Sequence, residues 1–139
     1  MRDEWISRLH DERCSLVVGN GEAISTFNGR GISDLYRLLK ENADMLHGAS
    51  VADKVVGKAA AALMIAGGVK EVFADIASIH ALSLFEKYGV KVRYAKGVPH
   101  IINRTNTGWC PMEIRCKDCT TIEECLEEIE GFMKQNKDR

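Results

Sequence analysis

The apolar positions near the amino terminus follow helical spacing first and strand spacing next. Residues 3–13 carry apolar side chains three and four positions apart among charged residues, which predicts a short amphipathic helix. Two β-prone runs, 15–18 and 23–27, flank Asn20 and Gly21, whose residue types tolerate the positive φ angles of a tight turn. We therefore expect two antiparallel strands joined as a hairpin.

Helical spacing returns after this hairpin. Ser33 stands before leucines that share one helix face, so the sequence predicts a helix over 33–46 with Ser33 as its cap. A second helix is predicted over 50–67, with Ser50 as its cap and Asp53 three residues later in the manner of a capping box.

Beyond Lys58 this second predicted helix is apolar on all sides, which is typical of a buried helix with a sheet beneath it and other elements over its back. Gly57 lies inside the predicted helix, between Lys54 and Lys58, where it costs about 1 kcal/mol relative to Ala. We expect another group to approach the backbone at Gly57.

The remaining segments predict a strand over 69–76, a helix over 79–87 and a strand over 90–94. A strand-helix-strand unit of this kind forms a parallel pair with a right-handed crossover. After residue 98 the chain is polar and rich in turn residues. Thr121 and Glu124 then form a second capping box before a closing helix.

These elements predict an α/β fold: a mixed sheet of about four to five strands, with the hairpin antiparallel and the later strands parallel, and helices on both faces. The 139 residues, 45% of them hydrophobic, suffice for one domain spanning 1–139. Such a domain buries roughly two-thirds of the surface that its unfolded chain would expose.

Charge and hydropathy exclude several classes of partner. Nineteen Lys and Arg against twenty Asp and Glu give a formal net charge of -1, so no global basic field favours nucleic acid. The longest mostly apolar stretch, 59–69, is about half of what a bilayer requires, and the amino terminus has no apolar core of signal-peptide length. We expect a cytoplasmic protein that binds neither nucleic acid nor membrane.

Four of the five cysteines lie between Cys110 and Cys125. Cys116 and Cys119 form a C-x-x-C pair, which can chelate zinc or an iron-sulfur cluster, but a structural zinc site usually needs a second pair or two histidines at matching spacing. Cys125 fits the apolar stripe of the closing helix and is most simply a core residue. The alternative interpretation of the pair is a solvated turn, and no metal or cofactor is expected.

Cys110 has a different setting. It precedes Pro111, a residue type favoured at the first position of a helix, and Glu113 follows in the first turn. Unpaired backbone N–H groups and the helix dipole favour a thiolate there, which is a physical basis for a nucleophile. The alternative is that Cys110 fills a gap beside Trp109.

Lys54 and Lys58 are four residues apart in the predicted helix and, with Arg104, could form a cationic pocket for a phosphate or carboxylate. The alternative is a solvated helix face. Because the rest of this helix is expected to be buried, we expect its charges to line a cleft.

Four stretches of the chain resemble the family described as domain of unknown function 1893. They are NGRGI at 28–32, ASVADKVVGKAA at 49–60, IINR at 101–104 and GWCPME at 108–113. The resemblance implies a three-layer, cytidine-deaminase-like sandwich, and a homodimer is possible because homo-oligomers are common among such folds. It also implies that six residues converge on a cleft, namely Asp53, Lys54, Asn103, Arg104, Cys110 and Glu113.

Zinc-dependent deaminases place H-x-E or C-x-E at the start of the helix after the hairpin, and P-C-x-x-C at the start of the next helix. The stretches that we expect to correspond, 51–54 and 77–80, lack the cysteine pair and the glutamate. Without a metal to lower the pKa of water from about 15.7 to roughly 7, hydrolytic deamination has no evident nucleophile.

Three functional hypotheses follow. The favoured one is a module that binds a small anionic or nucleotide-like ligand in the deaminase-type cleft through Lys58, Asn103 and Arg104, helped by Lys54. The second is an enzyme with Cys110 as nucleophile, Asp53 or Glu113 as acid or base, and Lys54 stabilising negative charge. The third is a metal-dependent hydrolase or deaminase with an unconventional site.

Overall fold

The computed structural model describes residues 3–11, 14–20, 23–28, 32–99, 101 and 111–137. Its strands form one five-stranded sheet in the order β2-β1-β3-β4-β5. β1 (Leu16–Asn20) pairs antiparallel with β2 (Ala23–Phe27) and with β3 (Ser50–Val56). β4 (Glu71–Ser78) and β5 (Lys91–Val98) extend the sheet in parallel from β3. The predicted mixed α/β sheet is confirmed.

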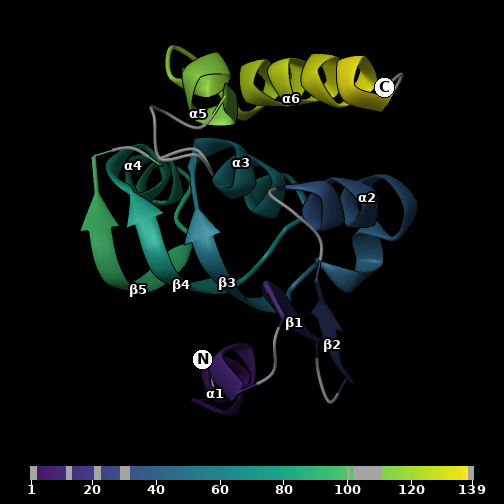
Figure 1. The fold of residues 1–139 in the computed structure, drawn as a ribbon, viewed down its shortest axis with the longest axis vertical. Coiled ribbons are helices and arrows are strands. Elements are labelled where there is room, and N and C mark those ends of the chain that lie inside the picture. The colour runs from purple at the N-terminus through teal and green to yellow at the C-terminus, as the bar shows by residue number, and fades with distance from the viewer. Residues whose placement is uncertain are drawn as a thin grey trace.

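Helices cover both faces of the sheet, as in a three-layer sandwich (Figure 1). α1 (Asp3–Asp11) packs on one face, where Leu9 joins a small apolar cluster with Val17 and Phe73. The other face carries α2 (Ser33–Glu41), followed by the short helix η1 (Ala43–Met45), and then α3 (Lys58–Ala66) and α4 (Ile79–Lys87). α5 (Pro111–Cys116) and α6 (Ile122–Lys137) lie over the outer side of α3.

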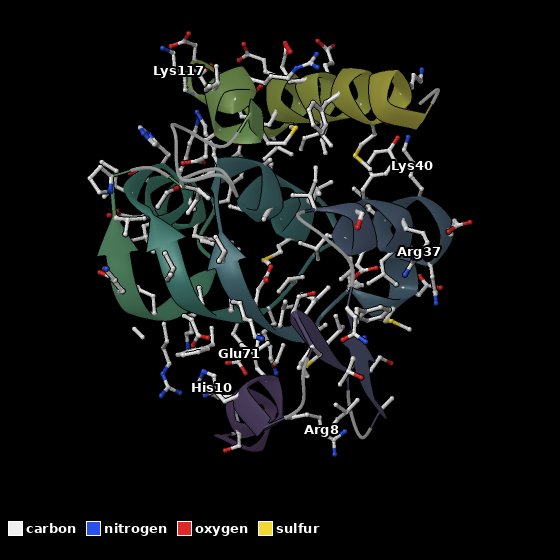
Figure 2. The ribbon with its side chains drawn as sticks, in the orientation of Figure 1. Arg8, His10, Arg37, Lys40, Glu71 and Lys117 are labelled. Carbon is white, nitrogen blue, oxygen red and sulfur yellow. The ribbon has the colours of Figure 1, made fainter. Side chains whose placement is uncertain are left out.

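Exposed polar side-chain contacts link the outer helices to the rest of the fold. Lys40 of α2 lies 2.9 Å from the carboxylate of Glu130 on α6, and Figure 2 shows Lys40 directed to the side of α2 that α6 covers. On the opposite side of the molecule, His10 of α1 lies 2.6 Å from Asp75 of β4. Exposed pairs of this kind contribute up to about 1 kcal/mol each, so apolar packing holds the layers together.

α3 is the helix on which this packing converges. Residues 58–64 are all buried, because the sheet lies beneath α3, α2 and α4 lie beside it, and α5 and α6 lie above it. Its alanines allow these neighbours to approach closely. The prediction of a helix buried all round is confirmed for this segment.

The predicted helix over 50–67 is wrong in its first half. Ser50–Val56 form β3, which lies between β1 and β4, and the helix begins only at Lys58. Ser50 caps no helix: its hydroxyl donates a hydrogen bond to Glu71 Oε1 at 2.7 Å, across the strand pair. A central strand that is covered on both faces lacks the alternation of apolar and polar residues by which a strand is recognised.

This correction changes the positions of Asp53 and Lys54. Side chains alternate across a strand, so the two point to opposite faces of the sheet. Asp53 lies level with Leu16 and Ala74 on the α3 side, whereas Lys54 is exposed on the α1 side and shares no helix face with Lys58. The segments 51–54 and 77–80 belong to β3 and to the junction of β4 and α4, so they are not the starts of the first two helices after the hairpin.

Of the predicted helix caps at Ser33 and Thr121, only the one at Thr121 is confirmed. Ser33 is the first residue of α2 rather than its cap, and Ile32 holds the cap position without a side-chain hydrogen bond. Thr121 Oγ1 accepts from the backbone N–H of Glu124 at 3.2 Å, which confirms one half of that capping box. The Glu124 carboxylate accepts from the N–H of Thr120 at 3.3 Å and also makes a backbone hydrogen bond with Thr121, the other half of the box. In the described part of the chain, no helix has the length and apolarity to cross a membrane.

The burial of α3 can be tested with two substitutions on the same helix. Ala61 is fully buried, so Ala61→Leu should lower the free energy of unfolding by about 1–3 kcal/mol, because the added carbons have no room. Ala66, at the exposed end of the helix, is the control, and Ala66→Leu should change that free energy by less than about 0.5 kcal/mol. Urea unfolding followed by circular dichroism measures both; equal effects would contradict the packing described.

Candidate functional site

A small pocket of about 100 Å³ lies at the carboxyl end of β3, where α3 begins. The caps of α2 and α3, the end of β3 and the start of α5 form its walls. The lining residues are Ile32, Val55, Gly57, Ala59, Ala60, Ile101, Met112 and Glu113. Glu113 is the ionisable side chain among them, and the other walls are apolar side chains and glycine backbone.

Glu113 is 3% exposed, and both of its carboxylate oxygens accept hydrogen bonds from backbone. Oε1 accepts from the N–H of Lys58 at 2.7 Å, and Oε2 accepts from the N–H of Ile101 at 3.1 Å. The N–H groups of a first helical turn have no partner within the helix. Glu113 therefore caps α3 from α5 and ties both helices to the chain at Ile101.

Gly57 makes this contact possible. A Cβ atom at position 57 would lie 2.8 Å from Glu113 Oε1 and 3.2 Å from Ile101 Cγ1. The expectation that a group approaches the backbone at Gly57 is thus confirmed, and the group is the Glu113 carboxylate. Gly57 occupies the cap of α3 rather than the interior of a helix.

Lys58 is 8% exposed, and its ammonium is directed to the turn that follows α5. There Nζ donates to the carbonyl oxygens of Cys119 and, at 3.2 Å, of Lys117. The first residue of α3 thus binds the start of α5 through its backbone and the end of α5 through its side chain.

Asp53 lies on β3, two residues before the pocket-lining Val55, and is 8% exposed. Burial raises the pKa of Asp53 to about 8, against hydrogen bonds from the N–H groups of Val55 and Lys54 that lower it. The nearby carboxylates of Asp34 and Asp75 raise the pKa further. At neutral pH the folded protein therefore holds Asp53 mostly as the neutral acid.

Of the seven residues predicted to form the site, the structure describes four. Asn103, Arg104 and Cys110 lie outside the described residues, so their predicted roles stay predictions. Among the four, Glu113 accepts a hydrogen bond from the backbone N–H of Lys58, and Asp53 is buried on β3. Lys54, on the opposite face of the sheet, does not join them.

A second group of side chains gathers where α5 ends. The Sγ atoms of Cys116, Cys119 and Cys125 all lie within 4.8 Å of one another. Hydrogen bonds from Cys116 and Cys119 lower the pKa of Cys125 to about 7, whereas the bond to Cys125, and then burial, raise that of Cys116. The prediction that Cys125 is a core residue is confirmed, and Cys125 also joins the C-x-x-C pair. Cys125 lies in the first turn of α6, six residues beyond Cys119, and this spacing is the sequence signal that could have indicated its contact with the pair.

Glu113→Gln tests the cap on α3. Glutamine keeps the shape but replaces one acceptor oxygen by an NH₂ donor, so the N–H of Lys58 or of Ile101 loses its partner. A buried group left without a partner costs about 1–3 kcal/mol, and the free energy of unfolding in urea should fall by that amount. Glu86→Gln, at an exposed position on α4, should change it by less than about 0.5 kcal/mol. If Glu113→Gln leaves the free energy of unfolding unchanged, the carboxylate does not cap α3.

Asp53→Asn tests the buried acid through pH. Between the ordinary pKa of 3.8 and the folded value of about 8, the folded state binds more protons at this group than the unfolded state does. Its contribution to stability therefore falls as pH rises across this window, by up to about 1.4 kcal/mol per pH unit, and is constant outside it. Asp53→Asn should be more stable than the wild type at pH 8 and close to it at pH 4, measured by urea unfolding. A difference that is the same at both pH values would contradict the raised pKa.

The match to known proteins covers almost the whole fold. The model of a family described as domain of unknown function (DUF1893) matches residues 5–133. The fold is similar to the crystal structure of a DUF1893 family protein from Thermotoga maritima, with a TM-score of 0.85 and 24% identity over 94% of this chain and 91% of that chain. No curated protein matches the sequence. The chain therefore belongs to the DUF1893 family.

Proposed function

We propose that this protein is a ligand-binding module of cytidine-deaminase-like architecture, and that its pocket takes the ring of a small nucleotide-like molecule. The observation that carries the proposal is the position of the pocket. It lies at the carboxyl end of β3, between the caps of α2 and α3, and in open α/β sheets this edge is where ligands bind.

The sheet order supports the cytidine-deaminase-like assignment, with an antiparallel hairpin followed by two parallel crossovers. In zinc deaminases the metal ligands stand at the starts of the helices that correspond to α2 and α3. Here those starts read Ile-Ser-Asp at 32–34 and Gly-Lys-Ala-Ala at 57–60, without histidine or cysteine. The residues at this position do not fit the deaminase zinc, which favours binding over zinc-dependent hydrolysis there.

The size of the pocket limits what enters it. Pockets for drug-sized ligands measure roughly 300–1,000 Å³, and this one measures about 100 Å³. One small ring, or the end of a larger molecule, therefore fits. Apolar walls at Val55 and Met112 suit the faces of a ring. Among the described residues, Glu113 Oε2 accepts only from the N–H of Ile101, so it suits an N–H donor on the edge of the ring.

The charges favour the ring over the phosphate as the group that enters. The Lys58 ammonium is bound to carbonyl oxygens, and Lys54 lies on the other face of the sheet, so these two lysines do not line the pocket as a cationic pair. The Glu113 carboxylate would repel an anion next to it. A phosphate on the ligand would therefore stay outside, where Arg104 is the predicted partner.

The enzyme hypothesis stays a prediction. Its nucleophile, Cys110, lies outside the described residues, and both oxygens of Glu113 are engaged by backbone N–H groups. Asp53 and Lys54 point to opposite faces of the sheet, so they do not act on one substrate from the positions that they hold.

The test is thermal unfolding of the full chain with cytidine, uridine, adenosine or guanosine, and with ribose 5-phosphate as the anionic sugar phosphate that lacks a base. A nucleoside that binds the folded state at 100 times its Kd should stabilise it by about 2.7 kcal/mol, whereas ribose 5-phosphate should have no effect. Val55→Phe should abolish the shift because the new ring fills the pocket. Ile114→Phe, on an exposed side chain of α5 that does not line the pocket, should preserve it.

Two results would contradict the proposal. One is the absence of a shift with all four nucleosides, and the other is an equal shift in the wild type and in Val55→Phe.

A further inference from the structure

We propose that Cys116, Cys119 and Cys125 form a metal site, which binds one thiophilic ion of the zinc class through three sulfur ligands. The site lies at the turn between α5 and α6, where Figure 2 labels Lys117. It is separate from the pocket and does not rest on the function proposed for it.

The geometry supplies three ligands that need little rearrangement. Zn–S bonds are about 2.3 Å long, so two sulfurs on one tetrahedral zinc lie about 3.8 Å apart. The three Sγ atoms all lie within 4.8 Å of one another without an ion, so a contraction of about 1 Å or less closes the site. Thiolates are the protein ligands that select zinc and similar soft ions.

The backbone around the three thiols is already fixed. The N–H of Cys119 donates to the carbonyl oxygen of Cys116 at 3.1 Å, which closes the C-x-x-C turn. The N–H of Ile122 donates to the Tyr88 hydroxyl at 3.2 Å and holds the start of α6, whose first turn carries Cys125. A preformed site of this kind loses less conformational entropy when it binds an ion.

Lys58 supplies the charge that such a site requires. Three thiolates and a divalent ion carry a net charge of -1, and the buried Lys58 ammonium hydrogen-bonds to the carbonyl oxygens of Cys119 and Lys117 in the same turn. Within the described part of the chain, this ammonium has no carboxylate within ion-pair distance. A buried charge normally has a partner of opposite charge. A metal-thiolate group of charge -1 would be that partner for the Lys58 ammonium.

Access and the fourth ligand come from a neighbouring cavity. Cys116 and Cys125 are fully buried, whereas Cys119 is partly exposed and lines a cavity of about 270 Å³ together with His80 and Ser83. An ion can enter by this route, and water can complete a four-coordinate site. On binding, three S–H groups release their protons to solvent and three S–Zn bonds form, with no change of oxidation state.

The experiment uses the full chain, reduced and stripped of metal with a chelator. Cobalt(II), added in the absence of oxygen, should produce sulfur-to-cobalt charge-transfer absorption that saturates at one ion per chain. Zinc should displace the cobalt and abolish this absorption. Zinc should also protect Cys116, Cys119 and Cys125 from alkylation, as mapped by peptide mass spectrometry. Cys125→Ser should raise the zinc Kd at least tenfold, because a three-sulfur site loses one ligand.

Cys14 provides the matched control, since it is a buried cysteine in the apolar cluster beneath α1 and lies apart from the other three. Cys14→Ser should bind zinc as the wild type does. Cys119→Ser, at the more exposed ligand, should weaken binding as Cys125→Ser does and serves if the latter fails to fold.

Three outcomes would overturn the proposal. They are the absence of charge-transfer absorption in fully reduced protein, wild-type zinc affinity in both ligand variants, and protection of the C-x-x-C pair without Cys125.

Discussion

The amino terminus of a buried helix needs hydrogen-bond acceptors, and in this protein a carboxylate from another helix supplies one to the first residue of α3. α3 begins beneath α5, and the N–H groups of its first turn have no partner within the helix. Glu113 reaches down from α5 and accepts from the N–H of Lys58 with one oxygen and from that of Ile101 with the other. The pocket wall at Glu113 and the attachment of α5 to the start of α3 depend on this contact.

Lys58 connects the two candidate sites. Its backbone faces the carboxylate that lines the pocket, and its ammonium faces the turn that carries the three cysteines. An ion bound by those cysteines would fix the turn, and through it α5 and Glu113. The pocket and the three-cysteine cluster are therefore joined through one residue of α3, although neither proposal requires the other.

β3 decides which charged groups can act together. As a strand it directs Asp53 into the core beneath α2 and α3, and Lys54 to the opposite face. Burial then raises the pKa of Asp53 to about 8, so the fold keeps a neutral acid there at a cost in stability that grows with pH. A cationic cleft built from Lys54 and Lys58 would need them on one helix face, and the sheet prevents that.

The sequence by itself determined those elements whose signals are local. The hairpin, α4 and the apolar stretch of α3 follow from periodicity and turn residues, and the unexpected Gly57 correctly indicated a close approach to the backbone. The tertiary structure alone decided that Ser50–Val56 is a strand, because its two partner strands are distant in the chain and burial on both faces removes the alternating pattern. It also decided that Glu113 caps α3 across 55 positions, because a contact between separate helices leaves no period in a sequence. The spacing of the three cysteines allows Cys125 to join Cys116 and Cys119, but only the packing of α6 against α5 turns Cys125 toward them.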